Sequence, residues 1–132
     1  MDALTKEQKK EMLDAFGERL VKKRDVVLEI AMKIATQTTI NPGKQKQYCA
    51  LSGLSTEQQE AVCDLLSEVI TNIIYSFFNM VEENAAMMKL VLIKNGTEYN
   101  MVDISEELGS EITFHDDSGW IQRFSKIGRF VS

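Results

Sequence analysis

The stretch STEQQEAVCDLLSEVITNIIYSFFNMVEE, residues 55–83, decides the fold. Its first four residues, Ser55 to Gln58, match a capping box, in which a hydroxyl and a longer side chain satisfy two backbone amides at a helix start. Ten apolar residues between Val62 and Val81 then recur at spacings of three and four, which is typical of a helix with a wide apolar face. We therefore predict a long helix that forms the centre of the core and ends near residues 82–84.

The residues before this stretch predict a second long helical region. Thr5 and Gln8 form another capping box, and an apolar stripe continues from there to Thr36. Gly17 costs such a helix about 1 kcal/mol relative to alanine, so the region is either one helix or two with a bend near this residue. The connector that follows contains a turn signal, Asn41-Pro42-Gly43, and a short helical turn is expected at 45–51.

After the decisive stretch the apolar period changes. Residues 89–102, KLVLIKNGTEYNMV, place two β-prone runs around Asn95-Gly96, and a type I′ hairpin turn needs positive φ at both of those positions. A third strand is expected at 111–114. Residues 120–126 then predict a short amphipathic helix, with Gly128 as the residue that stops it.

Because the helices precede the strands, we predict an α+β fold rather than α/β, in a single domain covering 1–132. The expected architecture is two long N-terminal antiparallel helices, a small antiparallel β-sheet built on the hairpin, and a short C-terminal helix. We find no internal repeat and no low-complexity segment in the sequence.

The net charge of −5 is unevenly distributed. All thirteen acids of residues 51–132 lie between Glu57 and Asp117, and the only bases in that range are Lys89 and Lys94. Four of the acids fall in the first half of the helix over 55–83, where they suit the helix dipole. Seven others follow on the hairpin and the loops after it, where helix stability does not account for them. Charge asymmetry of this kind bears on partners rather than on fold.

Catalytic and metal-binding motifs are not evident. His115 is the single histidine and lies beside two aspartates, but no nucleophile or further ligand accompanies it. No phosphate-binding glycine loop or nucleophile elbow is present. Cys49 and Cys63 lack the companion Cys or His that a zinc site requires. We therefore expect no metal and no cofactor, and we expect that the protein is not an enzyme.

The bases of the first helical region alternate with acids at helical spacing, for example Glu18 and Lys22. This pattern favours a solvated, salt-bridged face over a nucleic-acid-binding one, because phosphate binding is driven by positive charge and the sequence pI is about 4.9. No apolar run approaches the ~20 residues that span a bilayer, and residues 1–10 carry no apolar signal segment. We expect a cytoplasmic protein that binds neither nucleic acid nor a membrane.

The leading hypothesis is a non-enzymatic acidic binding protein that neutralises a basic macromolecular partner. Its most concrete version is a bacterial immunity or antitoxin-type inhibitor of a toxin nuclease, in which acids occupy the place of substrate phosphates. The expected partner-binding residues are the seven acids and one aromatic anchor: Glu98, Asp103, Glu106, Glu107, Glu111, Asp116, Asp117 and Trp120.

Two alternatives stay open. One is a phage- or plasmid-borne accessory protein that binds a small ligand or a host defence protein, with a pocket near Met87, Tyr99 and Trp120. The other is a small hydrolase that uses His115 and nearby carboxylates. Homodimerisation through the helix of residues 55–83 is compatible with every one of these hypotheses.

Overall fold

The computed structural model describes residues 4–36, 45–112 and 119–127. The chain is mostly helical, with one two-stranded antiparallel sheet and a short C-terminal helix. In chain order the elements are α1 (Lys6–Thr36), α2 (Gln45–Leu51), α3 (Thr56–Glu83), β1 (Val91–Lys94), β2 (Thr97–Asn100), α4 (Met101–Ile104), the 3₁₀ helix η2 (Leu108–Glu111) and α5 (Trp120–Phe124).

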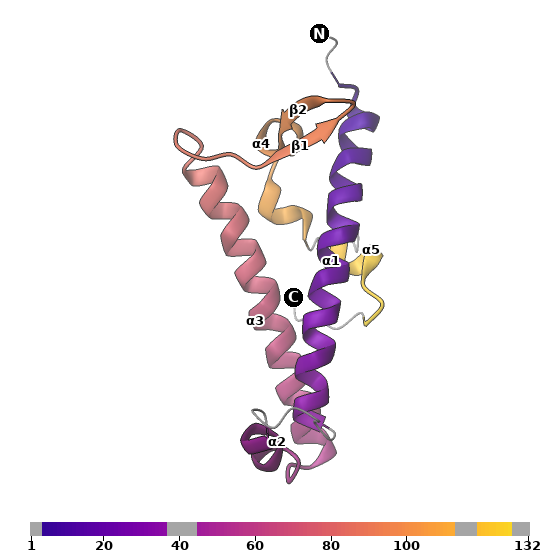
Figure 1. Cartoon of the computed structure of the whole chain (residues 1–132), viewed down its shortest axis with the longest axis vertical. Helices are drawn as coiled ribbons and strands as arrows, with labels where there is room; N and C mark the ends of the chain where they lie inside the picture. The colour runs from indigo at the N-terminus through magenta and orange to yellow at the C-terminus, as the bar shows by residue number, and fades with distance from the viewer. Residues whose placement is uncertain (1–3, 37–44, 113–118, 128–132) are drawn as a thin grey trace.

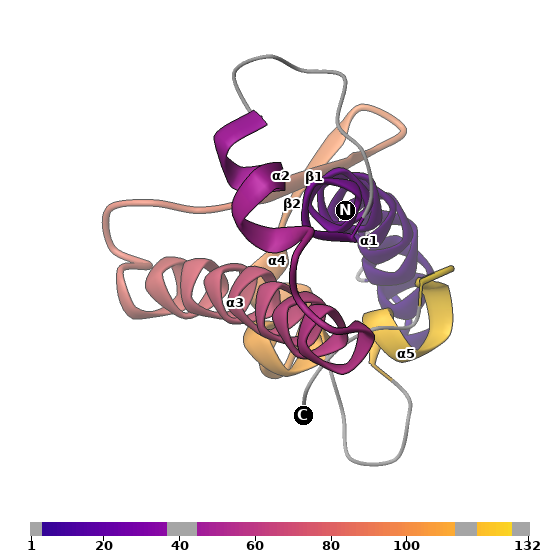
Figure 2. The same ribbon diagram turned by 90° about the horizontal axis from the view of Figure 1, so that it is seen from below.

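The two long helices α1 and α3 contact each other and diverge toward one end, where the hairpin and α4 lie (Figure 1). The view from below shows that α2 and α5 lie beside α1 on different sides of it (Figure 2). The prediction of a long antiparallel helix pair is confirmed in part. The two helices run in opposite directions, but the short helix α2, expected only as a helical turn, separates them in the chain.

Helix α1 is a single helix without a break at Gly17. It begins at the predicted capping box, since the Gln8 amide donates to Thr5 Oγ1 at 3.1 Å and the Thr5 amide donates to Gln8 Oε1 at 2.9 Å. Gly17 is buried because the indole of Trp120 lies against it, and a Cβ atom there would overlap the ring. The glycine therefore allows a close approach between helix and side chain rather than a bend.

Helix α3 also begins at its predicted capping box, where the Gln58 amide donates to Ser55 Oγ at 3.1 Å. The expectation that α3 forms the centre of the core holds only in part, because only one side of its wide apolar surface is buried. Its buried residues are Cys63, Ser67, Thr71, Phe78 and Val81, which share one face. Several of its large apolar residues remain exposed instead, because α1, α5 and η2 cover too little of the helix to bury them.

The hairpin forms as predicted around Asn95 and Gly96, whose φ angles of 53° and 80° are those a type I′ turn requires. The second strand ends at Asn100, earlier than expected. The Asn100 side chain accepts a hydrogen bond from the Val102 amide at 3.2 Å and so begins the short helix α4.

A third strand was expected at 111–114, and for residues 111 and 112 this prediction is wrong. Glu111 belongs to η2, and Ile112 has helical dihedrals, φ −67° and ψ −48°. The Ile112 amide donates to the Gly109 carbonyl at 3.4 Å, three residues earlier, which is the hydrogen bond of a 3₁₀ turn and not of a strand pair. Thr113 and Phe114 lie outside the described residues. The C-terminal helix α5 is confirmed, but it ends at Phe124 with Ser125 as its cap, ahead of Gly128, which is also outside the described residues.

The core lies between α1 and α3 and is closed by α4, η2 and α5. At its centre the rings of Phe16, Phe78 and Trp120 meet edge-on or tilted, with centroids 5.8–6.1 Å apart. Met101 and Leu108 are fully buried beside them. Aromatic pairs in such geometry stabilise beyond the area they bury.

A buried ion pair joins three parts of the chain. Arg24 Nη1 lies 2.9 Å from Asp25 Oδ1, and Arg24 Nη2 donates to the Ser67 hydroxyl of α3 at 2.6 Å. Asp25 in turn accepts from the Ser125 hydroxyl and from the Lys126 amide, both at 2.8 Å, just after α5. Burial lowers the pKa of Arg24, against the opposing effect of Asp25. The sequence placed Arg24 on a solvated face, and this expectation is wrong.

Candidate functional site

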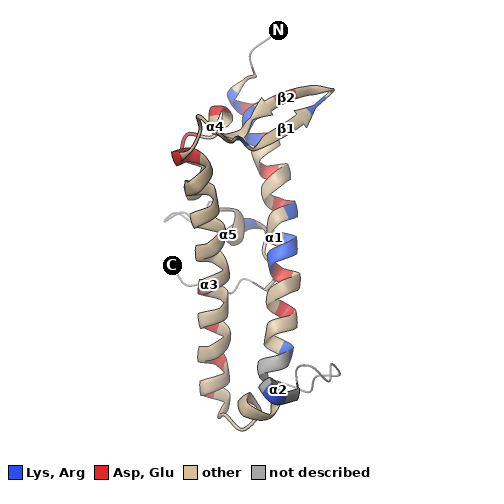
Figure 3. Ribbon diagram, turned by 60° about the vertical axis from the view of Figure 1, so that its left-hand side comes forward, with Lys and Arg blue, Asp and Glu red and all other residues tan. Residues whose placement is uncertain are grey.

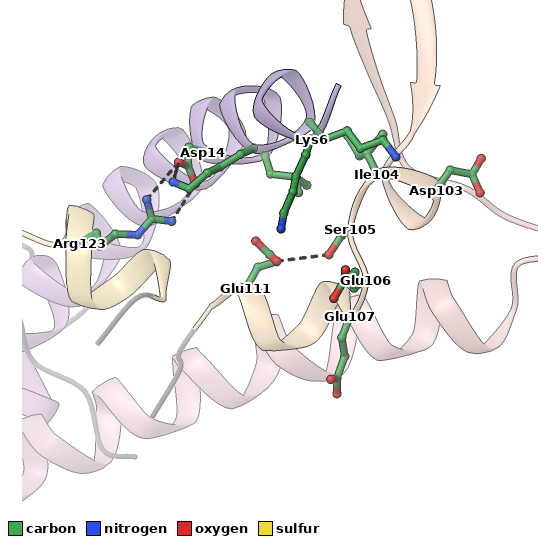
Figure 4. A pocket seen from close by; sticks show the side chains of 12 residues that line it. Lys6, Asp14, Asp103, Ile104, Ser105, Glu106, Glu107, Glu111 and Arg123 are labelled. Atoms are coloured by element: carbon green, nitrogen blue, oxygen red, sulfur yellow. Dashed lines mark hydrogen bonds and ion pairs between the residues drawn. The ribbon is translucent and has the colours of Figure 1, made fainter. Parts of the chain in front are cut away.

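A cleft of about 980 Å³ opens between the first turns of α1 and the segment from α4 to η2, with α5 at one end (Figure 4). Its lining is mostly charged and includes a few apolar residues at its base. The lining residues are Lys6, Lys9, Lys10, Leu13, Asp14, Asp103, Ile104, Ser105, Glu106, Glu107, Glu111 and Arg123.

Four of the eight expected partner-binding residues line this cleft, namely Asp103, Glu106, Glu107 and Glu111. They come together because α4 and η2 fold the chain back on itself within ten residues. Glu98 is exposed on β2, opposite Ile93, and does not line the cleft. Asp116, Asp117 and His115 lie outside the described residues.

Trp120, expected as an interface anchor, is fully buried in the aromatic core and offers no surface to a partner. Nor do the residues of the pocket expected near Met87, Tyr99 and Trp120 come together at the surface. Met87 is 77% exposed, whereas Trp120 is 0% exposed, so the two side chains do not share a cavity.

Four cations face these acids across the cleft, and sequence reasoning did not assign them to the site: Lys6, Lys9, Lys10 and Arg123. The three lysines come from the first turns of α1, directly after the Thr5 capping box. Spacing shows that they share a helical end, but their place opposite α4 depends on how α1 packs. The site is therefore a surface of both charge signs rather than a purely acidic one.

Asp14 is held by two of these cations. Arg123 donates to it through Nη2 at 2.7 Å and Nη1 at 3.1 Å, and Lys10 Nζ lies 3.0 Å from Asp14 Oδ2. The hydrogen bond from Arg123 is the main reason why the pKa of Asp14 is lowered, and Asp14 likewise raises the pKa of Arg123. The two-pronged contact fixes α5 against α1 at the edge of the cleft.

The pKa of Glu111 is shifted in the opposite direction from that of Asp14. Its carboxylate accepts a long hydrogen bond of 3.5 Å from the Ser105 hydroxyl (Figure 4). Burial is the main cause that raises the pKa of Glu111, and the negative charge of Asp14 adds to it. Arg123 and Lys10 oppose this shift without cancelling it.

The raised pKa of Glu111 predicts a pH-dependent effect of Glu111→Gln. The folded state holds the Glu111 proton more tightly than the unfolded chain, so the ionised carboxylate destabilises the fold as pH rises above its unfolded pKa. At pH 7 we expect the variant to unfold at higher urea concentration than the wild type. This gain should shrink as pH falls toward about 4, where the unfolded chain also binds the proton. Equal gains at both pH values, or a loss at pH 7, would contradict the assignment. Glu98→Gln, on the exposed hairpin, is the control.

Asp103, Glu106 and Glu107 form the outer edge of the cleft and are exposed; we call these three residues the acidic rim. Within the described ranges, no ion pair or hydrogen bond to their side chains is found. Asp103 and Glu107 point away from Glu111 and Arg123 (Figure 4). The end of α3 next to this segment is also acidic (Figure 3), and the Leu108 amide of η2 donates to Glu82 Oε2 at 3.3 Å.

The arrangement suits binding by charge. In the part of the chain that the structure describes, no group of three or more His, Cys, Asp or Glu residues is placed to hold a metal ion. The cleft offers carboxylates, ammonium groups and one guanidinium, all of which can pair with charged groups of a partner. No protein-family model, curated protein or solved structure matches this chain.

Proposed function

We propose that this chain is a non-enzymatic binding protein whose acidic rim receives a basic protein partner. In its most concrete form it is an immunity or antitoxin-type inhibitor of a toxin nuclease. The single observation that carries the proposal is the contrast between Asp14 and the rim. Asp14 is neutralised inside the molecule by Arg123 and Lys10, whereas the rim carboxylates have no such contacts among the described residues.

The carboxylates of the acidic rim remain available to pair with cations of a partner. The three rim acids lie within five residues of chain, so their mutual repulsion is relieved when lysines or arginines of a partner approach. Complementary charge mainly accelerates encounter and selects the partner, and its effect weakens with salt. An inhibitor of a nucleic-acid-cutting enzyme benefits from this, because the enzyme's own active-site surface is basic.

The lysines of α1 restrict which basic partner fits. A partner that places cations against Lys6 or Lys9 is repelled, whereas one that places cations against the rim and acids against α1 is favoured. The acidic rim and the lysines of α1 together therefore determine the orientation in which a partner binds as well as its affinity.

The test is capture of partners from a lysate by the immobilised protein at about 50 mM and about 300 mM salt, conditions that differ strongly in screening. The test variant is Asp103→Lys/Glu106→Lys/Glu107→Lys. The matched control is Glu11→Lys/Glu18→Lys/Glu29→Lys, which changes net charge equally on exposed positions of α1. We expect partners that bind the wild type and the control at low salt, with capture at least 10-fold weaker for the rim variant.

A captured partner that is a nuclease should lose activity when the wild-type protein is added and keep it when the rim variant is added. Partners that both variants lose equally would show an effect of net charge alone, and the rim would then have no role. Partners that neither salt nor the rim variant affects would overturn the electrostatic proposal.

A further inference from the structure

Helix α3 carries a second apolar face that the core does not use. Leu65, Val69, Ile73, Phe77 and Met80 are all exposed and are separated by four, four, four and three residues, so they line one side of the helix; we call them the α3 stripe. Ile73 is 64% exposed and Leu65 58%. Solitary exposed apolar residues are ordinary, but a continuous stripe of this length marks a surface for association.

The stripe lies beside the buried face of α3, with the half-buried Leu66 and Ile70 between the two. Thr71 faces the core and Ile73 does not, and two residues of helix rotate the side chain by about 200°. The buried face is also unlike the stripe in composition, since Ser67 and Thr71 occupy its middle. Helix α3 therefore presents more apolar surface than α1, α5 and η2 cover, and the stripe is the part that stays exposed.

We infer that the α3 stripe is covered by a second copy of this chain, with the two α3 helices packed antiparallel. A half-exposed large side chain presents on the order of 100 Å². Pairing two stripes would thus bury on the order of 1,000 Å², which reaches the lower limit of a specific interface. A two-fold pairing of identical surfaces is also the commonest way for chains to associate. This inference does not rest on the acidic rim.

Charge selects the antiparallel orientation. Helix α3 contains no Lys or Arg, and its four leading acids, Glu57, Glu60, Asp64 and Glu68, lie in its first half (Figure 3). A parallel pair would set these acids beside each other. An antiparallel pair centred on Ile73 sets three of the four level with residues 78, 86 and 89 of the other copy, none of which is acidic, and only Asp64 lies level with an acid, Glu82. Ile73 is the stripe residue nearest the midpoint, so the two copies of Ile73 meet at the two-fold axis.

A lipid bilayer fits the same helix less well. By length and composition α3 could cross a membrane, and only 22% of the relevant window is buried. However, its other face packs on α1 and holds the Ser67 hydroxyl against the buried Arg24. Helices that lie on membranes carry Lys and Arg beside their apolar face, whereas α3 carries acids there, which anionic lipids repel.

The test compares two identical substitutions at similarly exposed isoleucines. Ile73→Lys lies in the stripe, and Ile93→Lys lies on the hairpin, where Ile93 is 70% exposed. Sedimentation over about 1–100 µM chain should show a dimer for the wild type and for Ile93→Lys. For Ile73→Lys we expect a folded monomer by circular dichroism, with association weakened roughly 100-fold or more. A monomeric wild type, or a dimer that persists in Ile73→Lys, overturns the inference.

The orientation is tested by Ile73→Cys and Leu65→Cys, each in a Cys49→Ser background, since Cys49 is exposed and Cys63 is buried. A parallel pair brings both positions against their own copies, whereas the antiparallel pair does so only at position 73. Mild oxidation should therefore link the copies of the Ile73→Cys variant in high yield, while Leu65→Cys and the control Ile93→Cys should not link. Failure of Ile73→Cys to link, or linking of Leu65→Cys in equal yield, overturns the antiparallel register. Binding of the wild type to phosphatidylglycerol–phosphatidylethanolamine vesicles that Ile73→Lys abolishes would overturn the second copy as occupant.

Discussion

Replacing Arg24 with methionine is expected to lower the free energy of unfolding by about 3–5 kcal/mol, the usual cost of removing one member of a buried ion pair. The substitution leaves the carboxylate of Asp25, which is 9% exposed, without its cation. It also removes the donor that satisfies the Ser67 hydroxyl on α3. Urea denaturation at neutral pH, followed by circular dichroism, measures the loss.

Arg19→Met is the matched control for this experiment, because Arg19 is exposed on the same helix and, among the residues that the structure describes, donates only to the Ala15 carbonyl, at 2.8 Å. We expect it to change the free energy of unfolding by about 0.5 kcal/mol or less. The double variant Arg24→Met/Asp25→Leu removes both charges and should recover much of the lost stability. An Arg24→Met protein within about 1 kcal/mol of the wild type would mean that the pair does not connect α1 to α3 as described.

Replacing Trp120 with alanine is expected to cost about 3–5 kcal/mol, as for other fully buried large aromatics. The indole fills the space between Gly17 of α1 and the rings of Phe16 and Phe78, at centroid distances of 5.8 and 6.0 Å. Its removal leaves a cavity that the rigid helix α1 cannot close. Thermal and urea unfolding both report the loss, and a shift near zero would contradict this placement of the ring.

Gly17→Ala sharpens that test because its sign depends on Trp120. In a helix interior, alanine normally stabilises by about 1 kcal/mol relative to glycine. Here the added methyl group would overlap the indole, so we expect a loss of about 1–3 kcal/mol. In the Trp120→Ala background the overlap is gone, and Gly17→Ala should become stabilising. Gly53→Ala, where no atom lies within 4 Å of the added carbon, is the control without overlap. Additive effects at Gly17 and Trp120 would rule out the contact.

The candidate site illustrates where sequence reasoning succeeded and where it stopped. The four acids from Asp103 to Glu111 stood out because their charge had no local explanation, and all four line one cleft. The lysines opposite were visible only as part of a mixed-charge helix. Their role in the cleft depends on the packing of α1 against α4, between residues nearly a hundred positions apart in the chain.

The prediction for Trp120 was wrong, because the side chain was expected at an interface and lies in the core. A tryptophan near the end of a small acidic chain is compatible with an interface anchor and with a core residue, and composition does not separate the two. The difference lies in Gly17, whose missing side chain makes room for the indole more than a hundred residues away. A glycine in the middle of a long helical stripe was the signal that could have identified this contact.

By itself, the sequence determined the elements whose stabilising contacts are local. The capping boxes at Thr5 and Ser55 and the turn at Asn95-Gly96 involve residues at most three positions apart, so their spacing alone predicts the structure. Only the tertiary structure decided which face of α3 is buried, that Arg24 lies inside, and that 111–112 continue a helical turn. Those outcomes depend on how much surface distant elements can cover, and an apolar period shows that a face needs cover without showing what provides it.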